Sequence, residues 1–192
     1  LKTLNDIESV LRSGADKVVI NTAAVKNPDF ISEATREFGS STIAIAIEAI
    51  KQEDSSYMAY TDNGREYTGL DVVEWSKEIE QKGAGEIIIT SVNKEGTGEG
   101  YDLNLIHQIS DNINLPIVAH GGAGRKEDVL LLLEKNNVNA VSAASIFHYN
   151  YIQEEGYDYK TSDEGNTDFL SNISINKNLS PSNISDLKSY LK

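Results

Sequence analysis

Residues 15–22, which read ADKVVINT, decide the fold, because residues 138–145, which read VNAVSAAS, match them at an offset of 123 residues. The helical patterns that precede the two stretches, at residues 5–11 and 127–133, match as well. Four strand–helix units occupy roughly this length, since a barrel of eight such units averages about 250 residues. The repeat therefore predicts two half-barrels of a TIM barrel, with strand four at residues 18–20 and strand eight at residues 140–143.

Short apolar runs rich in Val and Ile alternate with amphipathic stretches between these two strands. Further buried strands are predicted at residues 42–47, 86–91 and 115–119. Apolar residues at three- and four-residue spacing predict helices at residues 28–38, 71–82, 103–112 and 126–135. Residues 57–61, followed by the turn-forming Asp62-Asn63-Gly64, predict a hairpin inserted after the strand at residues 42–47. The alternation favours an α/β fold with a parallel sheet closed as a barrel.

The two ends of the chain carry separate expectations. Leu1 opens directly into a helical pattern, so strands one to three are expected upstream, and residues 1–192 are predicted to be one partial TIM-barrel domain. Residues 149–183 are dominated by Glu, Asp, Asn, Ser and Tyr, and are predicted to be a polar insertion before a last helix at residues 185–191, capped by Ser185. An acidic surface loop is the simpler interpretation of the insertion, and a lid or partner contact is the alternative.

Composition narrows the classes of partner. A net charge of −13 repels phosphates and anionic membrane surfaces, so neither nucleic acid nor a membrane is expected as a partner. The chain has no cysteine, which excludes disulfides and thiolate chemistry and fits a cytoplasmic protein. No histidine lies at a metal-ligand spacing, and neither a metal nor a cofactor is expected.

Two carboxylates are candidates for catalysis. In TIM barrels, catalytic groups lie at the carboxyl ends of the strands. Glu48 follows the run IAIAI, and Glu95 lies just past the next predicted strand. Two carboxylates that face each other across the mouth of a barrel can divide the acid and base roles. A solvated carboxylate at a strand end is the alternative interpretation of Glu48. His120 ends strand seven, but the sequence shows no partner for its imidazole.

Two phosphate sites are predicted at the same mouth. Gly121 and Gly122 follow strand seven, where glycine lets backbone N–H groups approach a phosphate closely. Ser145 follows strand eight, and the repeat makes Thr22 its partner, with Asn21 beside it. Two such sites suit an elongated bisphosphate. Helix capping by Thr22 and Ser145 is the alternative interpretation.

Six ordered motifs resemble the cyclase subunits of imidazole glycerol phosphate synthase, a histidine-biosynthesis family with a TIM-barrel fold. The motifs are residues 14–25 (GADKVVINTAAV), 68–75 (TGLDVVEW), 83–91 (GAGEIIITS), 95–102 (EGTGEGYD), 121–124 (GGAG) and 143–148 (AASIFH). The resemblance implies a lyase-type cyclase without a cofactor, whose partner is a separate glutaminase subunit. Ammonia from glutamine would attack a phosphoribulosyl aminoimidazole carboxamide nucleotide, giving imidazole glycerol phosphate and aminoimidazole carboxamide ribotide.

The resemblance also assigns roles to single residues. Glu48 and Glu95 fall where the family has mouth aspartates, and the added methylene moves each carboxylate by about 1 Å or more, a misplacement that can cost about a hundredfold in rate. A further family aspartate would lie upstream of Leu1, so the chain alone is expected to be inactive. Phosphate-binding roles are implied for Asn21, Thr22, Gly96, Gly121, Gly122, Ala144 and Ser145. Lys17 and Glu86 match the gate for ammonia, and Asp16 matches a contact to the glutaminase.

Two other functions stay open at the level of sequence. His120 replaces a small hydroxyl residue of the family, and residues 149–183 are longer than the usual connection. These changes suggest a paralog that passes ammonia to a nucleotide sugar in surface-polysaccharide biosynthesis. A non-catalytic assembly scaffold is the alternative from another class. Any ammonia-dependent product would exclude the scaffold.

Overall fold

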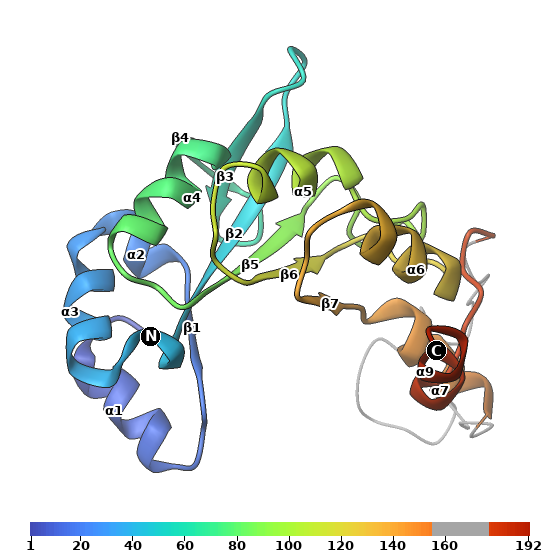
Figure 1. Cartoon of the computed structure of the whole chain (residues 1–192), viewed down its shortest axis with the longest axis horizontal. Helices are drawn as coiled ribbons and strands as arrows, with labels where there is room; N and C mark the ends of the chain where they lie inside the picture. Colours follow the sequence, from blue (N-terminus) through green and yellow to red (C-terminus); the bar gives the residue numbers. More distant parts are fainter. Residues whose placement is uncertain (155–176) are drawn as a thin grey trace.

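A computed structural model describes residues 1–154 and 177–192 of the protein. Parallel strands form an open arch at its centre (Figure 1). The parallel strands pair in the order β1 (Val18–Ile20), β2 (Ile43–Lys51), β5 (Glu86–Ser91), β6 (Ile117–His120) and β7 (Ala140–Ser142). Figure 1 shows them lining the underside of the arch. Within the described residues, β1 pairs only with β2 and β7 only with β6. The predicted α/β fold with a barrel-type parallel sheet is confirmed, and these strands do not close the barrel.

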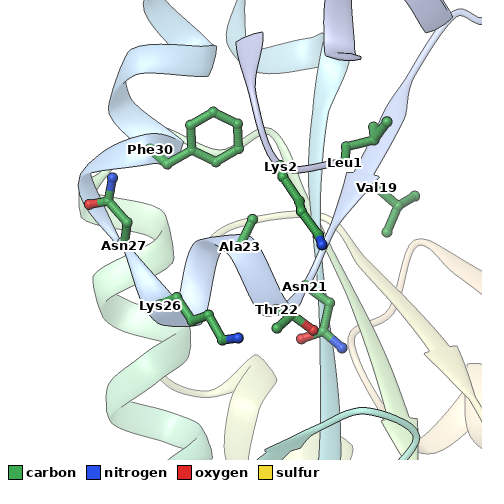
Figure 2. A pocket seen from close by; sticks show the side chains of 9 residues that line it. All are labelled: Leu1, Lys2, Val19, Asn21, Thr22, Ala23, Lys26, Asn27 and Phe30. Atoms are coloured by element: carbon green, nitrogen blue, oxygen red, sulfur yellow. The ribbon is translucent and has the colours of Figure 1, made fainter. Parts of the chain in front are cut away.

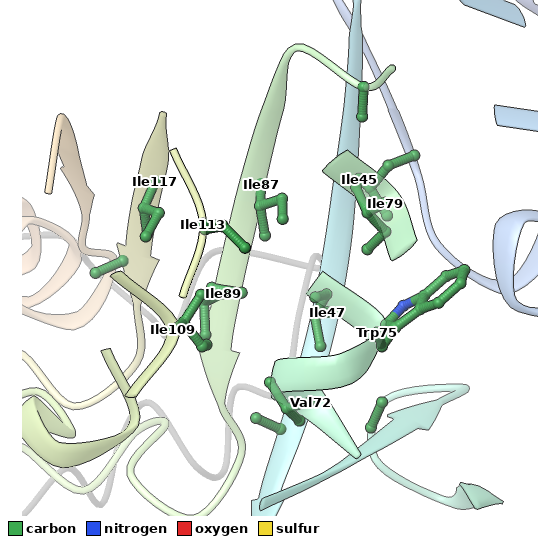
Figure 3. Packing of buried hydrophobic residues seen from close by; sticks show 14 of the residues in the cluster. Ile45, Ile47, Val72, Trp75, Ile79, Ile87, Ile89, Ile109, Ile113 and Ile117 are labelled. Carbon is green, nitrogen blue, oxygen red and sulfur yellow. The ribbon is translucent and has the colours of Figure 1, made fainter. Parts of the chain in front are cut away.

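Helices cover the convex side of the arch (Figure 1). They are α1 (Leu4–Arg12), α2 (Thr22–Lys26), α3 (Asp29–Phe38), α4 (Val72–Gln81), α5 (Leu103–Ser110) and α6 (Lys126–Lys135), with a short 3-10 turn η1 (Ser40–Thr42). Alternate residues of β2 and β5 point into this helical layer, where Ile47 lies beside α4 near Trp75 and Ile89 lies beside Ile109 of α5 (Figure 3). Burying side chains of this size stabilises the fold by about 1.5–3 kcal/mol each. The hydrophobic core therefore lies between the sheet and its helices.

The opposite face of the sheet carries side chains in level rows, which position the site. In the parallel register, Glu48 of β2 pairs with Thr90 of β5, Thr90 with His120 of β6, and His120 with Ser142 of β7. Because paired residues of parallel strands face the same side, these four side chains form one polar row on the concave face. The next row toward the amino ends is apolar and consists of Ala46, Ile88, Val118 and Ala140.

A hairpin, β3 (Tyr57–Thr61) and β4 (Glu66–Asp71), extends β2 and confirms the predicted hairpin. Asp62, Asn63 and Gly64 all adopt positive φ in its turn. The prediction that β2 ends at residue 47 is wrong, because β3 supplies antiparallel partners as far as Lys51. Glu48 therefore lies inside the strand, near the end of the part that pairs in parallel.

The carboxyl-terminal part of the chain returns to the sheet. Helix α7 (Ser145–Glu154) runs through residues 149–154, the first residues of the predicted polar insertion, and residues 155–176 lie outside the described residues. The last helix, α9 (Ile184–Tyr190), is capped by Asn183, whose side chain accepts from the backbone N–H of Asp186 at 2.8 Å. The prediction that Ser185 is the cap is therefore wrong, and the helix begins one residue earlier. Among the described residues, no helix is long and apolar enough to span a membrane.

Candidate active site

The predicted phosphate-binding residues share one rim of the arch. Thr22 and Ser145 are the first residues of α2 and α7, which follow β1 and β7. The strands that connect β1 to β7 across the sheet, β2, β5 and β6, all pair in parallel. The carboxyl ends of β1 and β7 therefore lie on the same rim. The polar row that contains Glu48 and His120 lies beside this rim. The two ends of the 123-residue repeat are therefore placed on either side of Glu48.

Glu48 is held by two donors. The side-chain Nδ2 of Asn21 donates to one carboxylate oxygen of Glu48 at 2.9 Å, and the backbone N–H of Gly64 donates to the other at 2.7 Å. Gly64 comes from the hairpin turn and Asn21 from the end of β1, so two separate segments fix one carboxylate. The side chain is half-buried. Charge-assisted bonds of this length are the stronger kind, and they favour a single orientation of the carboxylate.

Glu95 belongs to a second cluster. Its side chain is 56% exposed on the loop after β5, and its Oε1 lies 3.4 Å from Nε2 of His120. The other ring nitrogen of His120, Nδ1, lies 3.1 Å from Oγ of Ser142. Glu95, His120 and Ser142 therefore form a chain of polar contacts from the loop to the last strand. Sequence reasoning missed both partners of His120, Glu95 and Ser142, which lie 25 and 22 residues away along the chain. Ser142 is placed by the register of β6 and β7, and Glu95 by the path of the loop after β5.

The two carboxylates stand apart on the rim. Glu48 and His120 are two strands apart in the same row. At a strand spacing of about 4.8 Å, their Cα atoms are separated by about 10 Å along the sheet. Glu48 and Glu95 therefore border the concave face from two places, with Thr90 in the row between them. Groups placed in this way can act on different ends of one elongated molecule.

A first cavity of about 570 Å³ contains Asn21 and Thr22. Figure 2 shows that Lys2 and Lys26 line the same cavity as Asn21 and Thr22. Two lysines favour an anion electrostatically, and sequence reasoning missed both. The spacing of Lys26, one helical turn beyond Thr22, is the signal that could have found one of them.

A second cavity, of about 180 Å³, brings together the other predicted phosphate-binding residues. It is lined by Glu95, Gly96, His120, Gly121, Gly122, Ala123, Ser142, Ala143, Ala144 and Ser145. Gly122 has a φ of 101°, and a Cβ atom there would lie 2.2 Å from the backbone oxygen of Gly100. The backbone N–H of Gly100 donates to the oxygen of Gly122 at 2.8 Å. This glycine is therefore required where two loops cross, in addition to any part it has in binding an anion.

Tyr101 is hydrogen-bonded to Ser142, a residue that lines this cavity. Its hydroxyl donates to the backbone oxygen of Ser142 at 3.0 Å, and burial raises its pKa well above the usual value. The hydroxyl therefore stays protonated and remains a donor through the neutral pH range. The contact fixes the end of β7, and with it the Oγ atom that faces His120.

The amino-terminal side of the sheet carries an ion pair. Lys17, just before β1, places Nζ 2.8 Å from Oε2 of Glu86, the first residue of β5. The two residues assigned to the ammonia gate by resemblance are therefore in contact. Asp16, assigned to the glutaminase contact, is exposed next to Lys17. Both features lie at the amino ends of the strands, whereas the polar row lies near their carboxyl ends.

Comparisons with known proteins show the family to which the chain belongs. The family model described as "Histidine biosynthesis protein" matches residues 1–153. The chain is 50% identical over 152 residues to the imidazole glycerol phosphate synthase subunit HisF of Hydrogenobaculum sp. (strain Y04AAS1), an alignment that covers 79% of this chain and 60% of the relative. It is 48% identical over 149 residues to the protein of the same name from Dehalococcoides mccartyi (strain ATCC BAA-2100 / JCM 16839 / KCTC 5957 / BAV1), with 78% and 58% covered.

A more distant relative gives the same result. The chain is 40% identical over 167 residues to the HisF subunit of Clostridium botulinum (strain Okra / Type B1), with 82% of this chain and 66% of the relative covered. The chain thus spans about 60% of the length of the curated relatives it matches. The family model covers well over half of the sequence, and its match includes both cavities and the polar row. The chain therefore belongs to the histidine biosynthesis protein family.

Proposed function

We propose that this chain carries the cyclase site of an imidazole glycerol phosphate synthase. The observation that supports it most is the rim itself, where Glu48 lies between a cavity at Thr22 and a cavity at Ser145, and Glu95 lines the second cavity. A bisphosphate nucleotide would place one phosphate in each cavity. Its reacting centre would then lie over the polar row.

The carboxylates divide the proton transfers in this proposal. Glu48 is fixed by Asn21 and Gly64, so its free lone pairs have a defined direction toward the concave face. Glu95 is more exposed and contacts an imidazole, which gives it a different environment. Two carboxyl groups in unlike surroundings can serve as acid and base in one reaction. Proton transfer by a positioned carboxylate contributes about 10²–10⁴-fold to a rate.

Ammonia would reach the rim across the concave face. It would enter beside the Lys17–Glu86 pair, supplied by a glutaminase partner that contacts Asp16. The row between this pair and the rim is apolar, with Ala46, Ile88 and Val118 on successive strands. Apolar side chains do not hold ammonia by hydrogen bonds, so the molecule can pass to the carboxylates. The rim residues would then promote attack on the substrate, ring closure and cleavage.

Turnover by the native protein tests the proposal. The protein is given the phosphoribulosyl aminoimidazole carboxamide nucleotide and an ammonium salt, and imidazole glycerol phosphate is measured. We expect ammonia-dependent product, a loss of about a hundredfold or more in Glu48→Gln, and an unchanged rate in Glu53→Gln, a control at an exposed turn residue. No product from the wild-type protein would overturn the proposal. Amidation of a nucleotide sugar instead would support the polysaccharide paralog.

A further inference from the structure

The cavity at Ser145 has an unusual charge balance for an anion site. Among the described residues that line it, Glu95 and His120 are the only ones with ionisable side chains, and neither Lys nor Arg is present. The carboxylate of Glu95 would repel an anion in this small space. The cavity at Thr22, by contrast, holds Lys2 and Lys26. The Ser145 cavity therefore needs a source of positive charge before an anion and Glu95 can share it.

We infer that His120 is an anion-binding residue, and that the Ser145 cavity takes up a proton on His120 when it binds a phosphate-like anion. The inference rests on the proposed function, since it adds a residue to one of the two proposed phosphate sites. His120 lies on a strand rather than a loop, and only 22% of its side chain is exposed. A protonated imidazole beside Glu95 neutralises the carboxylate within the cavity.

The contact with Ser142 gives the proton a second effect. A neutral imidazole that donates from Nε2 to Glu95 leaves Nδ1 free to accept the hydroxyl hydrogen of Ser142, 3.1 Å away. A protonated imidazole donates from both nitrogens, so Oγ of Ser142 becomes an acceptor. Its hydroxyl hydrogen is then free for an anion, because Ser142 also lines the cavity. Protonation thus removes a repulsion and supplies a donor.

The other charged groups around the cavity are engaged elsewhere. Lys94, next to Glu95 in the same loop, places Nζ 3.0 Å from Oε2 of Glu99. Asp128 of α6 accepts from the backbone N–H of Gly124 at 2.8 Å. Tyr101 is a donor to the backbone oxygen of Ser142 and stays protonated because burial raises its pKa. The proton taken up with the anion is therefore assigned to His120.

Calorimetric titration with inorganic sulfate tests the inference without any turnover. Sulfate keeps the same charge between pH 6 and pH 8, so a change in its affinity reports on the protein. We expect wild-type protein to bind sulfate in this cavity about tenfold more tightly at pH 6 than at pH 8, and to take up protons on binding. His120→Asn, which keeps a polar side chain without the charge, is expected to lose both effects. Glu95→Gln is expected to bind more tightly at pH 8.

His107→Asn is the matched control, because His107 is exposed on α5 and outside the cavity. This variant should behave like wild-type protein. Crystals soaked in sulfate identify which cavity each binding event belongs to. If His120→Asn keeps the pH dependence and the proton uptake, the inference is wrong while the phosphate site stands. If wild-type protein binds neither sulfate nor inorganic phosphate in this cavity, the proposed phosphate site is wrong as well.

Discussion

Replacing Glu48 by Asp, the residue that the resemblance implies at this position, is expected to lower both stability and turnover. The two bonds to Asn21 and Gly64 measure 2.9 Å and 2.7 Å. Asp is shorter by about 1.5 Å, so both contacts would pass beyond hydrogen-bond distance. A bond to a charged group contributes about 1.5–3 kcal/mol, and partial access of water lowers the combined loss to about 2–3 kcal/mol. The melting temperature should fall by about 4–12 °C.

Turnover should fall with it, by about a hundredfold, because the carboxylate would lose its fixed direction. Thermal unfolding and ammonia-dependent turnover are measured on the same preparations. Glu53→Asp, at an exposed turn residue, is the control and should change stability by no more than about 0.5 kcal/mol. If Glu48→Asp melts and turns over like the wild-type protein, the two contacts do not set the position of the carboxylate, and the reasoning fails.

Three further predictions follow from single contacts. Tyr57→Phe removes a partly buried hydrogen bond of 2.9 Å from the Tyr57 hydroxyl to Asp102. The free energy of unfolding should fall by about 1–2 kcal/mol, measured as a lower midpoint in urea. Ser145→Asp should raise the Michaelis constant for a bisphosphate through like-charge repulsion; an unchanged constant would mean that the site is misassigned. Hydrogen bonds from the backbone N–H groups of Lys2 and Thr3 lower the pKa of Asp6 in the folded protein. The stability that the ionised Asp6 contributes is therefore complete above the unfolded pKa of about 3.9 and is lost as the pH falls through the lower folded pKa. Asp6→Asn should therefore flatten the acid side of the stability profile, and an unchanged profile would contradict this.

The strands were predictable from the sequence as continuous apolar runs. The runs of Val and Ile at residues 18–20 and 86–91 match β1 and β5, although the exposure of Val19, at 47%, shows that one face of β1 is open. The end of β2 was not predictable from its own residues. It is set by β3, which supplies backbone partners to Lys51 from a hairpin further along the chain.

The candidate site was predictable as a set of residues but not as a set of contacts. The repeat was sufficient to pair Thr22 with Ser145, since the same supersecondary unit recurs and both residues begin helices. The partners of His120 depend on the relative register of β6 and β7 and on the path of a loop, neither of which is encoded locally. For the same reason Gly122 was assigned to anion binding alone, although the approach of Gly100 also requires it.

A crystal structure of the native protein with the proposed bisphosphate nucleotide substrate tests the central claim most directly. The account predicts one phosphate beside Asn21 and Thr22, the other beside Gly122 and Ser145, and the nucleotide between them passing over Glu48. Phosphates bound at a single cavity, or at the amino ends of the strands where Lys17 contacts Glu86, would contradict it.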